Sequence, residues 1–434
     1  MAGQVRERLE AALARIADPQ GEGGRTFLKL YSDEARASAD AADARARFGH
    51  RLSPIDGKLV SIKDLFDVAG EPTTGGSIVY RDAPKASADA PVVQRLRAAG
   101  AVIVGKTNMT EFAFSGVGIN PHYGTPGNPA DRTRIPGGSS AGAAVSVAGG
   151  MCDIAIGSDT GGSVRIPAAL CGIAGFKPTQ ARVPRDGVMP LSLTADTIGP
   201  LARTVSDLAA TDAVMAGEAA RALVARPVAG LRLAIPRGRL FEKLDAAVSS
   251  AFEKAVATLV AKGAHVVEFD MSDLLARFDA INAIGLISAV EAEWKHKTAL
   301  AERAKDIDHR VVARIASGAK VSGADYLAML EMRKDLVRAA QAAFAPFEAV
   351  ILPTVAITAP KIADLEQDDA AFGAHNLLIL RNTTPFNQFD CPGLSLPLPD
   401  SGPLPVGLML MAARGRDHDI LSIGAGVEEL FLRA

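Results

Sequence analysis

A serine in a glycine-rich turn between a strand and a helix is the feature that most constrains this fold. Residues 157–167 read GSDTGGSVRIP and follow the apolar run DIAIG, which predicts a strand. A helix is expected to begin near Ile166 and to end before Gly172. The two glycines before Ser163 let the backbone approach another group without a Cβ. This arrangement suits a nucleophilic hydroxyl beside an oxyanion pocket.

The rest of the chain predicts the α/β class, with short apolar runs as strands and longer amphipathic runs as helices. Residues 231–270 have a strand–helix–strand pattern, which implies parallel pairing of the two strands. Residues 116–139 are expected to form a loop, and residues 272–345 to be almost entirely helical. Strands are expected at 59–63, 101–105, 153–157, 231–236, 265–270, 349–353 and, as a hairpin, 394–399 with 405–411; helices are expected at 4–17, 33–47, 92–99, 140–149, 203–215, 244–262 and 417–432.

Composition argues against several classes of partner. A net charge of −2 gives no electrostatic case for nucleic acid or a membrane surface. No run approaches 18 apolar residues, and the charged start MAGQVRERLE is unlike a signal peptide. The scattered Cys152, Cys171 and Cys391 argue against a disulfide framework and favour a reducing cytoplasm. Because no repeat or linker divides the chain, we expect one domain over residues 1–434, with a wide mixed sheet.

Two motifs match patterns whose structural context is absent. GAVIVGKT, residues 100–107, fits the sequence pattern of a phosphate loop. Its four middle residues, however, look like a buried strand, and a polar turn is expected to follow that strand. GSSAG, residues 138–142, fits a nucleophile elbow centred on Ser140, but a loop precedes it where an elbow needs a strand. We therefore expect neither nucleotide binding nor a serine–histidine hydrolase.

A serine hydroxyl needs a base at neutral pH, and no histidine lies within 35 residues of Ser163 on either side. Three residues stand out together: Lys63 at a strand end, Ser139 in a glycine-flanked turn, and Ser163. Each alone could be an ordinary surface or turn residue, but their order and spacing together indicate a catalytic set. The chain closely resembles the amidase signature family, most densely over residues 55–205. The matching stretches are GKLVSIKDLFDVAG, VVQRLRAAGAVIVGKTNMTEFA, YGTPGNP, GGSSAG, GSDTGGSVRIPAALCGIAGFKPT and DTIGPLART.

The resemblance implies a single-domain fold whose mixed sheet is covered by helices on both faces. It also implies an amidase that forms an acyl-enzyme, with Ser163 as nucleophile, Ser139 as bridge after a cis peptide bond, and Lys63 as base. Burial would lower the pKa of Lys63 enough for it to accept a proton. The expected products are a carboxylate and ammonia or an amine. No cofactor is required and no zinc-ligand spacing is apparent; the expected oxyanion donors are the backbone N–H groups of Thr160, Gly161, Gly162 and Ser163.

Other residues near the motif receive separate expectations. Arg165 is expected to be structural, and Cys171 to be a small buried side chain. Ala141 departs from the glycine more usual in the family. Substrate choice is expected to come from residues 112–126, the helical region 272–345 and residues 380–392. The expected pocket residues are Phe112, Phe114, Ser115, Gly116, Ile119 and Phe386.

Two alternative functions remain open at this point. The first is the A subunit of glutamyl-tRNA amidotransferase, which typically has an acidic residue where our alignment places Leu380. That leucine, and a somewhat short C-terminus, favour a stand-alone hydrolase. The second is a non-catalytic scaffold, although all three triad residues are present. A small-molecule amide is the expected partner, and a homodimer is possible on the family's habit alone.

Overall fold

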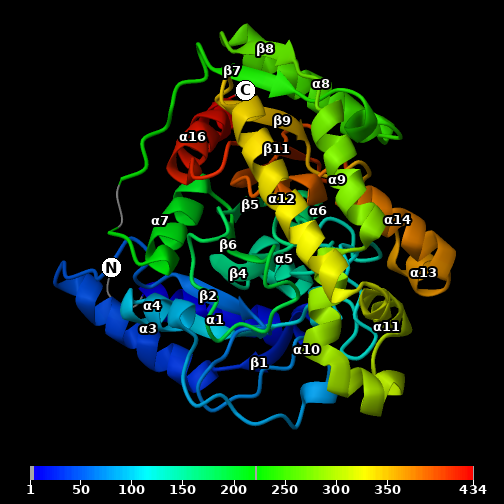
Figure 1. The fold of residues 1–434 in the computed structure, drawn as a ribbon. Coiled ribbons are helices and arrows are strands. Elements are labelled where there is room, and N and C mark those ends of the chain that lie inside the picture. Colours follow the sequence, from blue (N-terminus) through cyan, green and yellow to red (C-terminus); the bar gives the residue numbers. More distant parts are fainter. Residues whose placement is uncertain (1–3, 220–221, 434) are drawn as a thin grey trace.

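The computed structural model describes residues 4–219 and 222–433, and within them eleven strands form one mixed sheet (Figure 1). The strand order is β1-β3-β2-β4-β6-β5-β10-β11-β9-β7-β8. The strands are β1 (Phe27–Leu30), β2 (Leu59–Lys63), β3 (Val102–Thr107), β4 (Ile154–Asp159), β5 (Ala174–Lys177), β6 (Thr197–Ala202), β7 (Arg232–Ile235), β8 (His265–Glu268), β9 (Ala349–Pro353), β10 (Gly393–Pro397) and β11 (Gly407–Met411).

Strand pairing in the sheet is partly parallel and partly antiparallel. β2 pairs parallel with β3 and β4, while β4 pairs antiparallel with β6. The strand–helix–strand pattern of residues 231–270 is confirmed, because β7 and β8 pair in parallel with a helix between them. The predicted hairpin near the C-terminus is also confirmed, as β10 and β11 pair antiparallel.

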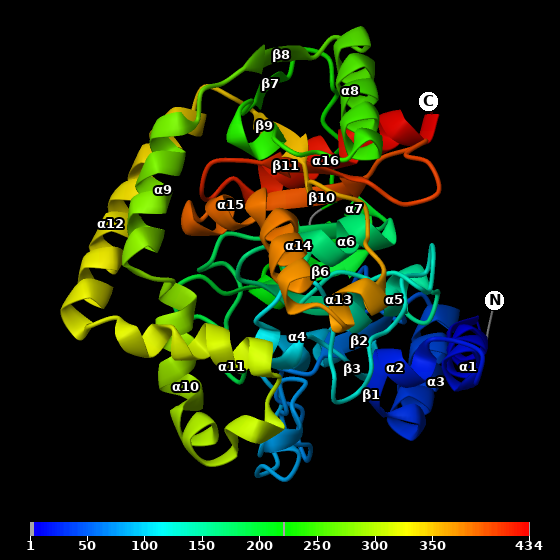
Figure 2. The ribbon, with the colours of Figure 1, turned by 90° about the vertical axis from the view of Figure 1, so that its right-hand side faces the viewer.

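Helices cover both faces of the sheet, as the resemblance implied (Figures 1 and 2). α5 and α6 pack on one face, against β4 and β10, while α7 and α16 pack on the other, against β6 and β10. The helices are α1 (Gln4–Ala17), α2 (Gly23–Thr26), α3 (Ser32–Arg47), α4 (Pro91–Ala98), α5 (Ala141–Ala148), α6 (Arg165–Cys171), α7 (Val205–Ala216), α8 (Ala246–Ala261), α9 (Ser272–Ile284), α10 (Ile287–Arg303), α11 (His309–Ala316), α12 (Gly323–Phe344), α13 (Ile362–Glu366), α14 (Asp369–Arg381), α15 (Thr384–Gln388) and α16 (Asp417–Arg433).

The predicted helical region 272–345 is confirmed as α9 to α12, which lie together along one side of the molecule (Figure 2). α9 and α12 pack against each other, and α10 contacts both α11 and α12. None of the helices in the described ranges combines the length and apolar composition needed for a membrane span.

The small-residue helix α5 is packed so closely that Gly142 has no room for a side chain. A Cβ at this position would lie 2.6 Å from the carbonyl oxygen of Thr26 and 2.7 Å from that of Asn108. The turn before α5 carries Ser139, so this close packing holds that turn against β3 and its following loop.

One local prediction is wrong in its extent. Residues 106 and 107 were expected to form a polar turn, but β3 continues to Thr107 and both side chains are buried. Lys106 Nζ lies 3.3 Å from the carboxylate of Asp64 and donates to the carbonyl oxygen of Pro72. The burial of the lysine with a carboxylate partner explains why this apparent phosphate loop is a strand.

Candidate active site

Lys63, at the end of β2, has no exposed surface and donates two hydrogen bonds to serines. Its Nζ lies 2.7 Å from Ser139 Oγ and 2.9 Å from Ser158 Oγ. Ser139 comes from the turn before α5 and Ser158 from β4, so three segments distant in the sequence meet at this amine. Sequence reasoning identified Ser139 but missed Ser158.

The environment of Lys63 favours the neutral amine. Burial lowers its pKa from the usual value to about 7, although the carboxylates of Asp196 and Asp159 act in the opposite direction. Asp64, the next residue, turns away to accept hydrogen bonds from Thr74 and Gly76. Close to neutral pH, the amine can therefore accept a proton as well as donate one.

Backbone contacts tie the turn carrying Ser139 to its surroundings. The Gly138–Ser139 peptide bond is cis. Gly138 N–H donates to the carbonyl oxygen of Gly116 at 2.8 Å, and Thr110 N–H donates to that of Ser139 at 3.0 Å. Ser140 N–H donates to the carbonyl oxygen of Ser163 at 3.3 Å, which joins the two serine segments.

The Ser163 hydroxyl is not part of this network. Ser163 is 4% exposed, and its Oγ makes no hydrogen bond to any residue that the structure describes. The structure therefore brings Lys63 and Ser139 into direct contact and leaves the hydroxyl of Ser163 available to another group.

The four backbone donors expected at the oxyanion pocket differ in their availability. Gly162 N–H already donates to Asp159 Oδ1 at 2.8 Å, so it is not free for a ligand, and we correct the expectation for this residue. The N–H groups of Thr160, Gly161 and Ser163 have no partner among the described residues. Gly162 has φ +131°, and a Cβ there would lie 2.2 Å from Thr383 Oγ1, so this position requires glycine.

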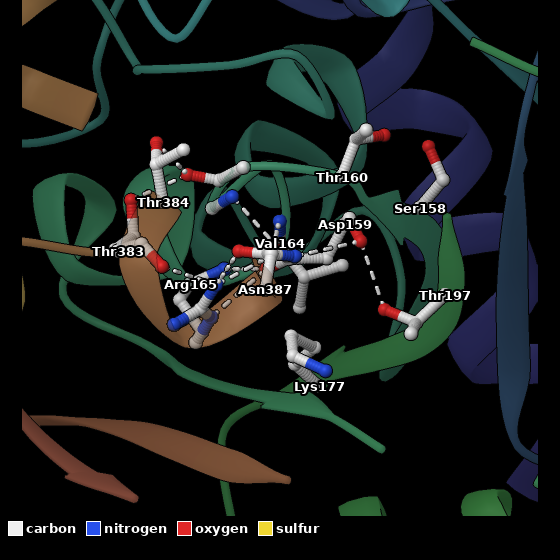
Figure 3. Close-up of polar contacts among 12 residues, drawn as sticks. Ser158, Asp159, Thr160, Val164, Arg165, Lys177, Thr197, Thr383, Thr384 and Asn387 are labelled. Carbon is white, nitrogen blue, oxygen red and sulfur yellow. Dashed lines mark hydrogen bonds and ion pairs between the residues drawn. The ribbon is translucent and has the colours of Figure 1, made fainter. Parts of the chain in front are cut away.

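Arg165 has the structural role expected for it, as the centre of a buried polar cluster (Figure 3). Its Nε and Nη2 each lie 3.0 Å from an oxygen of Asp159, and Nη2 also donates to Asn387 Oδ1 at 2.6 Å. Burial alone would raise the pKa of Asp159, but the charge of Arg165 holds that pKa well below its usual range. The cluster joins the end of β4 to α6 and α15 and thereby fixes the ends of the loop that carries Ser163.

The loop at Thr160 has a second buried carboxylate partner, which sequence reasoning missed. Thr160 Oγ1 donates to Asp196 Oδ1 at 2.5 Å. Burial raises the pKa of Asp196 to about 6, so this carboxyl is ionised at neutral pH. Asp196 is the first residue of the matching stretch DTIGPLART, but no role was expected for it from the sequence.

The residues expected to line one substrate pocket lie in different clusters. Phe112 stacks on His296 with ring centroids 4.0 Å apart. Ser115 Oγ and Gly116 N–H both donate to Asn376 Oδ1. Ile119 belongs to an apolar cluster with Val117 and Ile166, and Phe386, which has no exposed surface, packs with Phe344 and Phe389.

Phe114 has a cationic neighbour that sequence reasoning also missed. The Arg314 guanidinium, from α11, lies 4.6 Å from the centroid of the Phe114 ring. It makes no hydrogen bond or ion pair to any residue in the described ranges, and burial lowers its pKa to about 10. The side chain is only partly buried, so its guanidinium keeps some contact with solvent.

The remaining sequence candidates show no catalytic arrangement. Ser140 lies at the start of α5 and follows a loop. Its Oγ donates to the carbonyl oxygen of Ser158 at 3.4 Å. Cys171 is buried, and burial raises the pKa of its thiol. In the part of the chain that the structure describes, no three His, Cys, Asp or Glu side chains are grouped as metal ligands.

Known proteins resemble this chain over most of its length. A family model described as Amidase matches residues 7–421. The 2-amino-5-chloromuconic acid deaminase of Comamonas testosteroni is 36% identical over 404 residues, covering 91% of this chain and 86% of that protein. The glutamyl-tRNA(Gln) amidotransferase A subunit of Anaeromyxobacter sp. (strain K) is 38% identical over 451 residues, covering 95% and 89%. A solved structure reported as a vestigial complex bearing on the origins of an s-triazine catabolic enzyme has 32% identity and a TM-score of 0.87, covering 98% of this chain and 95% of that one.

Proposed function

Because this chain belongs to the amidase family, which hydrolyses amide C–N bonds, we propose that it does so through a Ser163 acyl-enzyme with Ser139 and Lys63 as the proton route. The observation that carries the proposal is the buried Lys63 amine, 2.7 Å from Ser139 Oγ. With a pKa of about 7, this amine is neutral in mildly alkaline solution and can accept a proton.

In the proposed reaction, Ser163 Oγ attacks the amide carbonyl carbon while its proton passes to Ser139 and the Ser139 proton passes to Lys63. When the tetrahedral adduct collapses, the C–N bond breaks and the proton returns through Ser139 to the leaving nitrogen, which departs as ammonia. Water then cleaves the ester and restores the Ser163 hydroxyl. The route requires Ser163 Oγ to lie within hydrogen-bond distance of Ser139 Oγ when an amide is bound.

We assign the oxyanion pocket to the N–H groups of Thr160, Gly161 and Ser163, which have no partner among the described residues. Donors of this kind act where charge develops, and removing one typically costs about 10²–10³ in rate. The Arg165 cluster supports them indirectly, because Asp159 holds both Arg165 and the N–H of Gly162.

Arg314 supports an amide that also carries a carboxylate as the substrate class. A guanidinium without a partner is suited to bidentate binding of a carboxylate. The Arg314 guanidinium stacks on the ring of Phe114. Two residues after Phe114, the carbonyl oxygen of Gly116 accepts a hydrogen bond from the N–H of Gly138, which lies in the same turn as Ser139. The similar deaminase is named for an acid, 2-amino-5-chloromuconic acid, which is consistent with this class.

The second candidate function is a glutamine amidase that serves a tRNA-charging complex, and the similarity to the A subunit of the amidotransferase favours it. Glutamine carries an ammonium beside its carboxylate. A Cβ placed on Gly161 would lie 3.6 Å from Leu380 Cδ2, so a leucine, which cannot pair with an ammonium, borders the oxyanion loop. We therefore favour an amide acid that lacks this ammonium.

Ammonia release from a matched panel tests the proposal. Glutaramic acid carries the carboxylate without the ammonium, glutamine carries both, and butyramide carries neither. We expect the highest kcat/KM for the first, no release by Ser163→Ala, and a loss of preference over butyramide in Arg314→Met. Ammonia release by Ser163→Ala equal to the wild type would contradict the catalytic assignment, and an unchanged preference in Arg314→Met would contradict the substrate class.

A further inference from the structure

The short segment Leu191–Asp196 is joined to the oxyanion loop by one carboxylate. Asp196, which is 6% exposed, accepts the Thr160 hydroxyl on Oδ1 at 2.5 Å. Its Oδ2 accepts the backbone N–H groups of Leu191 and Ser192, both at 3.0 Å. The carboxylate therefore closes this segment on itself and fastens it to Thr160.

A second buried carboxylate joins the same segment to the helical region. Glu291 of α10 accepts the hydroxyls of Ser192 and Thr194, and the Thr194 N–H at 3.3 Å. It also accepts the Tyr326 hydroxyl of α12 at 2.7 Å. Glu291 is 5% exposed, and its several donors compensate for its removal from water. The segment is thus held from both sides by buried charges.

The same segment borders a cavity beside the proposed base. The cavity has a volume of about 370 Å³, and its wall includes Ser158, whose Oγ lies 2.9 Å from Lys63 Nζ. Leu193 and Asp196 form another part of that wall, so the position of the segment affects space next to Lys63. The remaining lining residues are Arg185, Asp186, Val188, Pro190, Thr197 and Ile198.

We propose that Asp196 and Glu291 are positioning residues, which together hold Thr160 and its oxyanion loop in a fixed place relative to helices α10 and α12. The proposal rests on the proposed function, since it gives the loop at Thr160 a role in oxyanion binding. If the connection is broken, the loop can still bind an amide, but its N–H groups no longer meet the developing charge in a fixed geometry. The loss then falls on kcat more than on KM.

Electrostatics give the Asp196 connection a second, separable consequence. Asp196 faces Arg185, Glu291 and Lys63, and Lys63 in turn faces Asp196 and Asp159. The negative charge of Asp196 favours the ammonium form of Lys63. Replacing Asp196 with asparagine removes this charge, so the pKa of Lys63 falls and the rise of activity with pH begins at lower pH.

A fluorophosphonate reporter that labels reactive serines tests the proposal without a known substrate. Ser163 Oγ would form the bond to phosphorus, fluoride would leave, and the serine proton would pass to Lys63. We expect Asp196→Asn to lower the labelling rate constant at least tenfold at its optimum and to move the half-maximal pH downward. Thr160→Val and Glu291→Gln should lower the rate several-fold, and Thr160→Val should move the half-maximal pH less than Asp196→Asn does. Glu302→Gln, an exposed carboxylate near the end of α10, is the matched control and should label like the wild type.

The outcomes separate this inference from the proposed function. If the wild type is not labelled at Ser163, the proposed function fails. If Ser163 is labelled and the variants at 160, 196 and 291 match the wild type in rate and pH dependence, the positioning role is overturned. If Asp196→Asn does not fold, as shown by its thermal melt, Thr160→Val and Glu291→Gln decide the question through their rates relative to Glu302→Gln.

Discussion

At the scale of single residues, the site depends on keeping a lysine out of water. An ammonium in a low-dielectric interior is costly, so a buried lysine shifts towards its neutral form. Lys63 has two serine hydroxyls within 3 Å, and its pKa is lowered to about 7. Lys177 is also fully buried with a lowered pKa, but it donates to the carbonyl oxygen of Pro178 and has no serine partner among the residues that the structure describes. Burial makes the neutral amine available near neutral pH, and the two hydroxyls are the groups with which it can exchange a proton.

The first prediction is the pH dependence of the reaction. Below pH 7, Lys63 is an ammonium and cannot accept a proton, whereas above pH 7 it is neutral. We therefore expect kcat/KM for an amide substrate to rise through a midpoint near pH 7 and to level off above pH 8. Initial rates of ammonia release between pH 5 and 9 measure this. A flat profile over that range would mean that Lys63 is not the base.

The second prediction concerns stability. Between pH 7 and 10, the unfolded chain holds a proton on Lys63 that the folded chain has lost, so this residue makes stability rise with pH. Lys63→Met should abolish activity yet raise the free energy of unfolding at pH 7, with an upper limit of about 4 kcal/mol. The unpaired hydroxyls of Ser139 and Ser158 reduce that gain. Urea melts at pH 7 and 9 check it, since the difference between variant and wild type should shrink at pH 9.

The site could be predicted from sequence only where a local motif marks a residue. Lys63 and Ser139 stand in recognisable motifs, and the structure has them in contact. Ser158 and Asp196 lie inside matching stretches and Arg314 lies outside them, but none of the three was expected to have a role, because their importance comes from which side chains the fold brings next to them. Phe386 was expected to line the substrate pocket because it is an aromatic residue within the segment 380–392. In the structure it packs into the core against Phe389 instead of facing Phe114.

At the scale of elements, strong periodicity predicted secondary structure well. α1 and β2 have the predicted bounds, and α8 differs from its prediction by two residues at one end and one at the other. Three strands were missed for physical reasons. β6 contains Gly199 and Pro200, which normally indicate a turn, while β1 and β5 have only four residues each. The helices α13 to α15 were also not predicted, and Gly373 within α14 weakens its pattern.

The third prediction tests how β4, α6 and α15 are held together. Arg165→Met removes one partner of a fully buried ion pair and leaves the charge of Asp159 uncompensated, which costs about 3–5 kcal/mol. We expect urea unfolding of this variant to show that loss. Asp159→Asn in the same chain should restore part of the stability, because no unpaired charge then remains. Strict additivity of the two changes would show that the pair is not coupled.

At the scale of the whole molecule, one sheet connects segments from both ends of the chain. β5, from the middle of the sequence, pairs with β6 on one side and with the late strand β10 on the other. The helical region α9 to α12 leaves this sheet after β8 and returns at β9. Since Lys63 and Ser158 lie on β2 and β4, and Ser139 and Ser163 lie in turns outside the strands, the proposed site is built where the early strands meet. Helices α10 and α12 are connected to the segment Leu191–Asp196 of this site through Glu291.

The fourth prediction uses the cysteines to test whether this sheet unfolds as one unit. Cys152, Cys171 and Cys391 are free, buried and in three different apolar clusters. Burial raises the pKa of each thiol, that of Cys391 to about 12, so none should react with a thiol reagent in the native protein. A continuous sheet couples the three clusters, so all three thiols should become reactive over the same range of urea concentration as the loss of circular dichroism.

Variants that keep one cysteine each identify which thiol reacts. Exposure of Cys391 at a clearly lower urea concentration than Cys152 would show that the later strands unfold independently, and the chain would then consist of two cooperative units.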